Sequence, residues 1–145
     1  MSEIIIVSSC LAGVKCRYDG NDNSVEEIIE LVKSGKAVAL CPEVMGKLLI
    51  PRASCEIVNG KIITKEGKDC TAEFKLGAQK TLEIAKILES KTAILKQNSP
   101  SCGFGRIYDG TFTGNRIDGN GVCAQLLSEN GIKIFNEDNY HNIIK

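Results

Sequence analysis

The sequence predicts an α/β protein with a mostly parallel β-sheet, helices on both faces of the sheet and a small hairpin insertion. Short apolar runs rich in β-branched residues alternate along the chain with longer segments whose apolar residues recur every three or four positions. The short runs are continuously apolar, as expected of strands that are buried on both faces of a parallel sheet. One domain is expected over residues 1–145, because no linker, repeat or low-complexity tract interrupts them.

The chain opens with a predicted strand at residues 4–7, where the sequence reads IIIV. A helix is expected over residues 24–35, because the apolar residues there share one face at helical spacing. Ser24 and Glu27 have the spacing of a capping box, which predicts the start of this helix. Gly35 stands where a glycine commonly ends a helix.

The middle of the chain holds a second predicted strand, AVALC at residues 37–41, followed by a hairpin. In residues 56–67, EIVNGKIITKEG, an Asn-Gly pair separates two short apolar runs. That pattern is a strong signal for a tight turn between antiparallel strands. A long helix is then expected over residues 71–89, and the apolar run at 92–96 predicts a third strand of the sheet.

The last third of the chain repeats the alternation of helix and strand. Residues 107–114, IYDGTFTG, predict a small turn or hairpin in which Asp109, before a glycine, forms the turn. A helix is expected over residues 121–130 and a fourth strand over 132–135. A short C-terminal helix is expected to hold three apolar side chains, those of Tyr140, Ile143 and Ile144.

Composition and charge exclude several classes of function. Lysine plus arginine and aspartate plus glutamate number 18 each, so no net charge attracts nucleic acid or an anionic membrane. No apolar run is long enough to span a bilayer, and the start lacks the basic flank and cleavage site of a signal peptide. We therefore expect a cytoplasmic protein whose seven cysteines serve ligation, reactivity or burial rather than disulfide bonds.

Three of the cysteines stand at equivalent places in the predicted fold. Cys10 follows the first strand, Cys41 ends the second, and Cys102 follows the third. The carboxyl ends of parallel strands meet in one crevice, where ligands usually bind, so these thiols are expected to converge. Cys16 lies in the loop after the first strand, at the same edge of the sheet.

The residues alone leave the chemistry of these thiols open. Thiolates at such a crevice suit zinc, an iron–sulfur cluster or direct reactivity. No C-x-x-C pair is present, and the single histidine, His141, is typical of a surface residue near the terminus. The other cysteines are expected to be small buried side chains outside the site, namely Cys55, Cys70 and Cys123.

Five ordered motifs give the chain a resemblance to the thiouracil desulfurase family. They read SSCLAGVKCRYDG, CPEVMG, LKQNSPSCG, IYDGTFTG and GNGVCAQLL, and the similarity covers nearly the whole chain. The resemblance implies a Rossmann-like domain carrying an oxygen-sensitive 4Fe-4S cluster on three cysteines, with one iron left open. It also implies non-redox removal of sulfur from thiolated uracil-type compounds, which gives uracil and hydrosulfide. Aerobically handled protein is expected to lose such a cluster.

Cluster ligands and a mechanism follow from this resemblance as expectations. We expect Cys10, Cys41 and Cys102 to hold the cluster, since each is anchored at a strand end, with Cys16 as the next candidate. Substrate sulfur is expected to bind the open iron, water to attack the carbon, and hydrosulfide to leave. The expected substrate is a small thiolated base or nucleotide. No nucleic-acid or membrane partner is expected, and the oligomeric state is left open.

Glu43 is the expected general acid or base. It lies two residues past Cys41, and a carboxylate beside a buried cluster is expected to have a raised pKa, which suits proton transfer near neutrality. The alternative is a structural ion pair with Arg17 or Arg52.

Three more side chains of the cysteine loops are expected in the site. Ser101, beside Cys102, is the expected catalytic hydroxyl, its alternative role being to cap the turn after Pro100. Arg17 and Asp19, in the first loop, are expected to bind substrate.

A different kind of protein remains the alternative to a desulfurase. The four thiols of the loops, closed around zinc, would form a structural site with no open position. The same cysteines would also suit a redox-regulatory protein in which the thiols themselves react.

Overall fold

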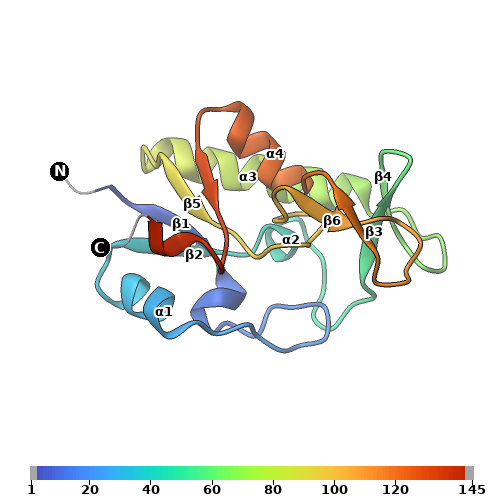
Figure 1. The fold of residues 1–145 in the computed structure, drawn as a ribbon, viewed down its shortest axis with the longest axis horizontal. Helices are drawn as coiled ribbons and strands as arrows, with labels where there is room; N and C mark the ends of the chain where they lie inside the picture. The colour runs from blue at the N-terminus through green and yellow to red at the C-terminus, as the bar shows by residue number, and fades with distance from the viewer. Residues whose placement is uncertain (1–2, 143–145) are drawn as a thin grey trace.

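The centre of the fold is a parallel sheet of four strands in the order β2-β1-β5-β8 (Figure 1). The structure is a computed structural model, and it describes residues 3–142. The strands of the sheet are β1 (Ile5–Ser8), β2 (Ala37–Leu40), β5 (Thr92–Ile94) and β8 (Lys133–Phe135). These are the four runs that the sequence assigned to the sheet, so the predicted α/β class is confirmed.

Both faces of the sheet are covered by helices (Figure 1). Ile6 of β1 packs into a core with α3 (Thr71–Ile87) and α4 (Val122–Glu129) on one face. The next residue, Val7, packs into a separate core with α1 (Glu26–Lys33) on the other face. Successive side chains of a strand point to opposite faces, so a continuously apolar strand supplies both cores.

The strand order creates a crevice at one edge of the sheet. From β1 the chain passes to β2 on one side, and it returns later to β5 on the other side of β1. The loops that follow β1 and β5 therefore leave the sheet in opposite directions. In open α/β sheets the space between such loops, outside the carboxyl ends of the strands, is where ligands bind.

Two hairpins stand beside this crevice, outside the main sheet (Figure 1). The first joins β3 (Cys55–Val58) to β4 (Lys61–Thr64) through Asn59 and Gly60, whose φ angles are 51° and 79°. Two positive φ angles belong to the turn that an Asn-Gly pair favours, so the predicted hairpin is confirmed. The second hairpin pairs β6 (Arg106–Tyr108) with β7 (Arg116–Asp118), and its tip contains most of the predicted turn.

The start of α1 differs from the prediction. The helix begins at Glu26 after Val25, and no side chain caps it. The hydroxyl of Ser24 instead donates a hydrogen bond of 2.6 Å to Asp22. The predicted capping box is therefore wrong, because the aspartate two residues earlier competes for the serine hydroxyl. Gly35 does follow the helix, with a φ of 76°.

Besides η1 (Ser9–Ala12), a 3₁₀ turn directly after β1, two short helical elements complete the fold. One is α2 (Pro42–Met45), which the sequence did not predict because four residues are too few to show a period. The other is η2 (Tyr140–Asn142), a 3₁₀ turn at the place of the predicted C-terminal helix, whose Ile143 and Ile144 lie outside the described residues. Among residues 3–142 there is no helix with the length and apolar character needed to cross a membrane.

Candidate active site

A cavity of about 460 Å³ lies at the carboxyl edge of the sheet. Its inner wall comes from the loops after β1, β2 and β5, and its outer wall from the two hairpins. Five thiols, two carboxylates, two guanidinium groups, two lysine ammonium groups and several hydroxyls line it. The segments that meet here are far apart in the sequence, and the sheet topology brings them together.

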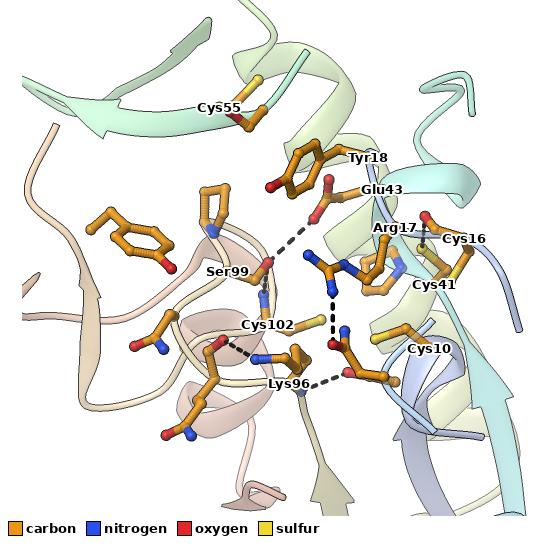
Figure 2. A pocket seen from close by; sticks show the side chains of 18 of the residues that line it. Cys10, Cys16, Arg17, Tyr18, Cys41, Glu43, Cys55, Lys96, Ser99 and Cys102 are labelled. Atoms are coloured by element: carbon orange, nitrogen blue, oxygen red, sulfur yellow. Dashed lines mark hydrogen bonds between the residues drawn. The ribbon is translucent and has the colours of Figure 1, made fainter. Parts of the chain in front are cut away.

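Cys10, Cys16, Cys41 and Cys102 all line this cavity, as the strand ends predicted. In Figure 2 the Cys102 sulfur points across the cavity toward Cys10 and toward the adjacent Cys16 and Cys41. All four are free thiols; Cys10, Cys16 and Cys102 are buried, and Cys41 is partly exposed. Thiols from three strand ends therefore enclose one small volume.

The four thiols differ in acidity. Cys16 lies within hydrogen-bonding reach of both Cys10 and Cys41, and its thiol lowers the pKa of each. The pKa of Cys41 falls to about 7, whereas the pKa of Cys16 itself is raised, because hydrogen bonds to its two neighbours hold its proton. Burial raises the pKa of Cys102 well above its ordinary value. Thus Cys41 and Cys10 are the thiols that ionise first.

Glu43 projects into the cavity from α2 and is held by Arg52. The Nε and Nη2 groups of Arg52 donate hydrogen bonds of 3.2 and 3.0 Å to Oε1 of Glu43. Nη2 also donates to the carbonyl oxygen of Cys16 at 3.0 Å. Both side chains are largely buried, at 9% and 19% exposed for Arg52 and Glu43. Arg52 therefore ties the loop after β1 to the helix that carries the carboxylate.

The other carboxylate oxygen of Glu43 faces Ser99. The Ser99 hydroxyl donates to Oε2 at 3.2 Å and accepts hydrogen bonds from the backbone N–H groups of Ser101 and Cys102 (Figure 2). Ser99 thereby links the carboxylate to the loop that carries Cys102. Glu43 therefore forms an ion pair with Arg52, one of the two partners considered in its alternative structural role. It also lies in the cavity wall, where the expected catalytic role would place it.

Ser101 does not line the cavity, although the sequence nominated it as the catalytic hydroxyl. Its side chain is fully buried, and its Oγ has no hydrogen-bond partner among the described residues. Its carbonyl oxygen accepts from the N–H groups of Cys123 and Ala124 at the start of α4. The cavity hydroxyl of the SPS sequence is therefore Ser99, because the turn at Pro100 sends the two serines in different directions.

Arg17 lines the cavity, and Asp19 supports it from outside. The Nη2 of Arg17 lies 3.3 Å from Oδ2 of Asp19, and Nη1 donates to Asn23 at 3.0 Å. A hydrogen bond from the backbone N–H of Asn21, with the nearby Arg17, lowers the pKa of Asp19. Of the two residues expected to bind substrate, only Arg17 lines the cavity, and Asp19 lies behind it.

Two glycines set the position of the CPE motif. A Cβ at Gly77 of α3 would lie 1.7 Å from the carbonyl oxygen of Pro42, and one at Gly46 would lie 1.9 Å from the carbonyl of Glu73. No side chain fits in either place, so α2 rests directly on the backbone of α3. This contact fixes Glu43 relative to the sheet.

Sequence reasoning missed several residues of the outer wall. Cys55, at the start of β3, lines the cavity although it was assigned to the core (Figure 2). Nothing in a lone cysteine before a hairpin signals this. Asp109 does form the predicted turn, since its Oδ1 accepts from the N–H of Thr111 at 2.9 Å. Lining residues that the sequence did not nominate come from both walls, and they include Tyr18, Glu56, Lys65, Lys96, Ser99 and Phe112.

The donor set suits a group larger than one ion. Within residues 3–142, no three histidine, cysteine, aspartate or glutamate side chains are grouped closely enough to hold a single metal ion. A single zinc needs all its sulfur ligands about 2.3 Å from one point. A cluster takes each thiolate on a different iron, so it accepts thiols spread around a cavity. Soft thiolates on three loops around an open volume fit such a cluster.

Comparison with known proteins agrees with this site. The model of the 2-thiouracil desulfurase family matches residues 5–139, which include the four thiols of the cavity. The uncharacterized protein YbbK of Bacillus subtilis (strain 168) is 44% identical over 151 residues, covering 97% of this chain and all of YbbK.

Among solved structures, the 4Fe-4S-dependent thiouracil desulfidase TudS is similar, with a TM-score of 0.94. Its sequence is 41% identical, and the match covers 97% of this chain and 95% of that one. The family match, the identity over nearly the full length and the shared fold confirm the resemblance read from the motifs. The chain belongs to the 2-thiouracil desulfurase family.

Proposed function

We propose that this protein is a 4Fe-4S-dependent desulfurase that removes sulfur from small thiolated uracil-type bases. One observation carries the proposal: four thiols from three strand ends line a cavity that also contains a positioned carboxylate. The similarity to TudS, a 4Fe-4S-dependent thiouracil desulfidase, supports the same chemistry for this cavity. Seven free cysteines suit a reducing compartment, and we place the activity in the cytoplasm.

Cys10, Cys41 and Cys102 are the proposed ligands. Each follows a different strand of the sheet, so together they would coordinate a cluster from three sides. Cys16 is the alternative ligand, and in the proposed site its thiol lies within hydrogen-bonding reach of Cys10 and Cys41. When bound, the cluster supplies an iron without a protein ligand, which attracts the thiocarbonyl sulfur and makes the neighbouring carbon electrophilic.

Glu43 is the proposed general base. It takes a proton from the water that attacks the thiocarbonyl carbon, so a carbon–oxygen bond forms as the carbon–sulfur bond breaks. The sulfur leaves with the bonding electron pair as hydrosulfide, and the net reaction consumes one water and gives the oxo base. Arg52 holds one carboxylate oxygen, which leaves the oxygen near Ser99 to receive the proton.

Ser99 and Arg17 are proposed to orient the substrate and its product. The Ser99 hydroxyl lies between the carboxylate and the Cys102 loop, where it can hydrogen-bond the attacking water or the base. The lining of the cavity also carries more cations than carboxylates: Arg17, Arg52, Lys65 and Lys96 against Glu43 and Glu56. An excess of cations suits the hydrosulfide anion that forms there.

The decisive experiment is anaerobic purification and reconstitution with iron and sulfide, followed by a hydrosulfide assay on 2-thiouracil. We expect about four irons and four acid-labile sulfides per chain and stoichiometric formation of uracil. Cys10→Ala, Cys41→Ala and Cys102→Ala are each expected to lose the cluster, whereas Cys16→Ala keeps it. A protein that releases no hydrosulfide when fully loaded, or that works equally well with zinc or without metal, would contradict the proposal.

A further inference from the structure

The tip of the β6–β7 hairpin forms part of the cavity wall and has no role in the proposed chemistry. The tip contributes Phe112 and Gly114 to the lining, and Tyr108 of β6 lines the cavity beside them. Phe112 is half-buried, and its backbone has a φ of 59°, in the left-handed region. A bulky residue rarely adopts that strained conformation, which persists only where the surroundings impose it.

Glu56 of β3 imposes that conformation. It is 9% exposed, and its Oε1 accepts two backbone hydrogen bonds from the hairpin tip. The donors are the N–H groups of Gly110, at 2.9 Å, and of Phe112, at 3.2 Å. Bonds from backbone N–H groups to a carboxylate are stronger than those between neutral groups, so one buried side chain fixes the loop on both sides of Thr111.

The backbone of the tip also rests directly on β3, beside which β6 lies in Figure 1. Gly110 has a φ of 91°, and a Cβ there would lie 2.7 Å from the carbonyl oxygen of Ile57. Only glycine combines this conformation with this approach. The hairpin tip is therefore held against β3 by a close backbone contact and by the Glu56 carboxylate, and Phe112 is the large apolar side chain of that tip at the cavity.

We propose that Phe112 is a specificity-determining residue that stacks on the flat face of the heterocyclic substrate, and that Glu56 is its positioning residue. The proposal deepens the desulfurase function and rests on it. The cavity lining contains three aromatic rings, those of Tyr18, Tyr108 and Phe112, and Phe112 is the one whose backbone N–H is held by the Glu56 carboxylate. An aromatic ring recognises any planar base, since each presents a π-face.

The variants are chosen to separate the ring from the backbone strain. Phe112→Gly removes the ring and relieves the positive φ, so the protein is expected to stay folded. Phe112→Tyr keeps an aromatic ring at the same place. Stacking on one base corresponds to about a five- to hundredfold change in affinity, which sets the size of the expected loss.

Binding of uracil to the loaded protein, measured anaerobically by calorimetry, is the first readout. We expect the affinity to fall at least about fivefold in Phe112→Gly and to return in Phe112→Tyr. The second readout is kcat/KM for 2-thiouracil relative to thioacetamide, which has a thiocarbonyl and no ring. We expect Phe112→Gly to lower this ratio through KM for 2-thiouracil, with thioacetamide turnover unchanged. A smaller fall in the affinity for uracil, or no recovery of this affinity in Phe112→Tyr, overturns the proposal.

Glu56 is tested by a matched pair of variants. Glu56→Gln keeps an oxygen that accepts the two N–H groups, and Glu56→Ala removes it. We expect Glu56→Ala to raise KM for 2-thiouracil as Phe112→Gly does, with kcat little changed, and Glu56→Gln to restore most of the difference. Equal effects of both variants, or loss confined to kcat, contradict the positioning role.

The outcomes separate this inference from the function on which it rests. Uracil binding that depends on Phe112, without hydrosulfide release from 2-thiouracil, leaves the base-stacking site standing and removes the desulfurase proposal. If the protein turns over 2-thiouracil and Phe112→Gly leaves the KM for 2-thiouracil and the affinity for uracil unchanged, the desulfurase proposal stands and the base-stacking site is removed.

Discussion

Ser99 and Glu43 are joined by a hydrogen bond of 3.2 Å between the serine hydroxyl and Oε2 of the carboxylate. Ser99 lies in the loop that follows β5, and Glu43 lies in α2, which follows β2. Their contact therefore closes the cavity wall between Cys41 and Cys102. A carboxylate held at one oxygen by arginine and at the other by a hydroxyl has a defined direction, which general base catalysis requires.

Glu43→Gln is expected to lower kcat on 2-thiouracil by about a hundredfold or more, because the amide cannot take a proton from water. The amide oxygen still accepts from Arg52, so the iron content and the fold should be those of the parent protein. Parallel measurements of iron, acid-labile sulfide and hydrosulfide release check this. Full turnover by a loaded Glu43→Gln protein would remove the proposed general base.

Ser99→Ala is expected to reduce activity more than Ser101→Ala. The first variant deletes the hydroxyl that contacts Glu43 and accepts two backbone N–H groups. The second deletes a buried hydroxyl that has no hydrogen-bond partner among residues 3–142. Steady-state assays of both variants under identical loading decide between the two serines, and a larger loss in Ser101→Ala would reverse the assignment.

The Arg52–Glu43 pair is expected to matter for stability. Breaking a largely buried ion pair by removing one partner costs about 3–5 kcal/mol, so Arg52→Leu should lower the free energy of unfolding in urea by a substantial part of that amount. Arg106→Leu is the matched control, because its pair with Asp118 is exposed and such pairs contribute about 0–1 kcal/mol. Equal losses in the two variants would show that burial of the pair is irrelevant.

Cys41 is expected to be the most readily alkylated of the ligand thiols once the cluster is removed. Its pKa of about 7 means that thiolate accumulates as the pH rises through 7, so its rate with iodoacetamide should rise between about pH 6 and 8 and then level off. Cys102 should stay unmodified over that range, because burial raises its pKa. Mass spectrometry of peptides after timed alkylation measures both.

The cause of the low Cys41 pKa is tested by two changes at Cys16. Cys16→Ala removes the hydrogen-bonding thiol and is expected to move the alkylation profile of Cys41 to higher pH. Cys16→Ser retains a donor and should move it less. An unchanged profile in Cys16→Ala would mean that another group sets this pKa.

Gly77→Ala is expected to destabilise the protein, although the same change in an open helix position stabilises by about 1 kcal/mol. The new methyl would overlap the carbonyl of Pro42, and overpacking of this kind costs about 1–3 kcal/mol or more. Activity should fall as well, since Pro42 precedes Glu43. Gln79→Ala, at an exposed position of the same helix, is the control and should change stability by less than about 0.5 kcal/mol.

Local patterns determined the elements and the class of the fold. The apolar runs, the Asn-Gly turn and Gly35 gave strands, a hairpin and a helix end where the structure has them, because these signals depend on residues close in sequence. The convergence of the four thiols was also predictable, since parallel strands share one carboxyl edge. The predicted capping box was wrong because the Ser24 hydroxyl donates a hydrogen bond to Asp22, a residue just outside the pattern.

Tertiary structure alone decided which side chains face the cavity. Ser99 rather than Ser101 faces Glu43, and Cys55 and Phe112 join the wall from hairpins, because side-chain direction depends on turns and contacts between distant segments. The seating of α2 on Gly77 is likewise invisible in sequence, since it is a contact between two backbones. The sequence by itself thus determined the sheet and the thiols at its edge, and packing between loops decided the direction of the groups around them.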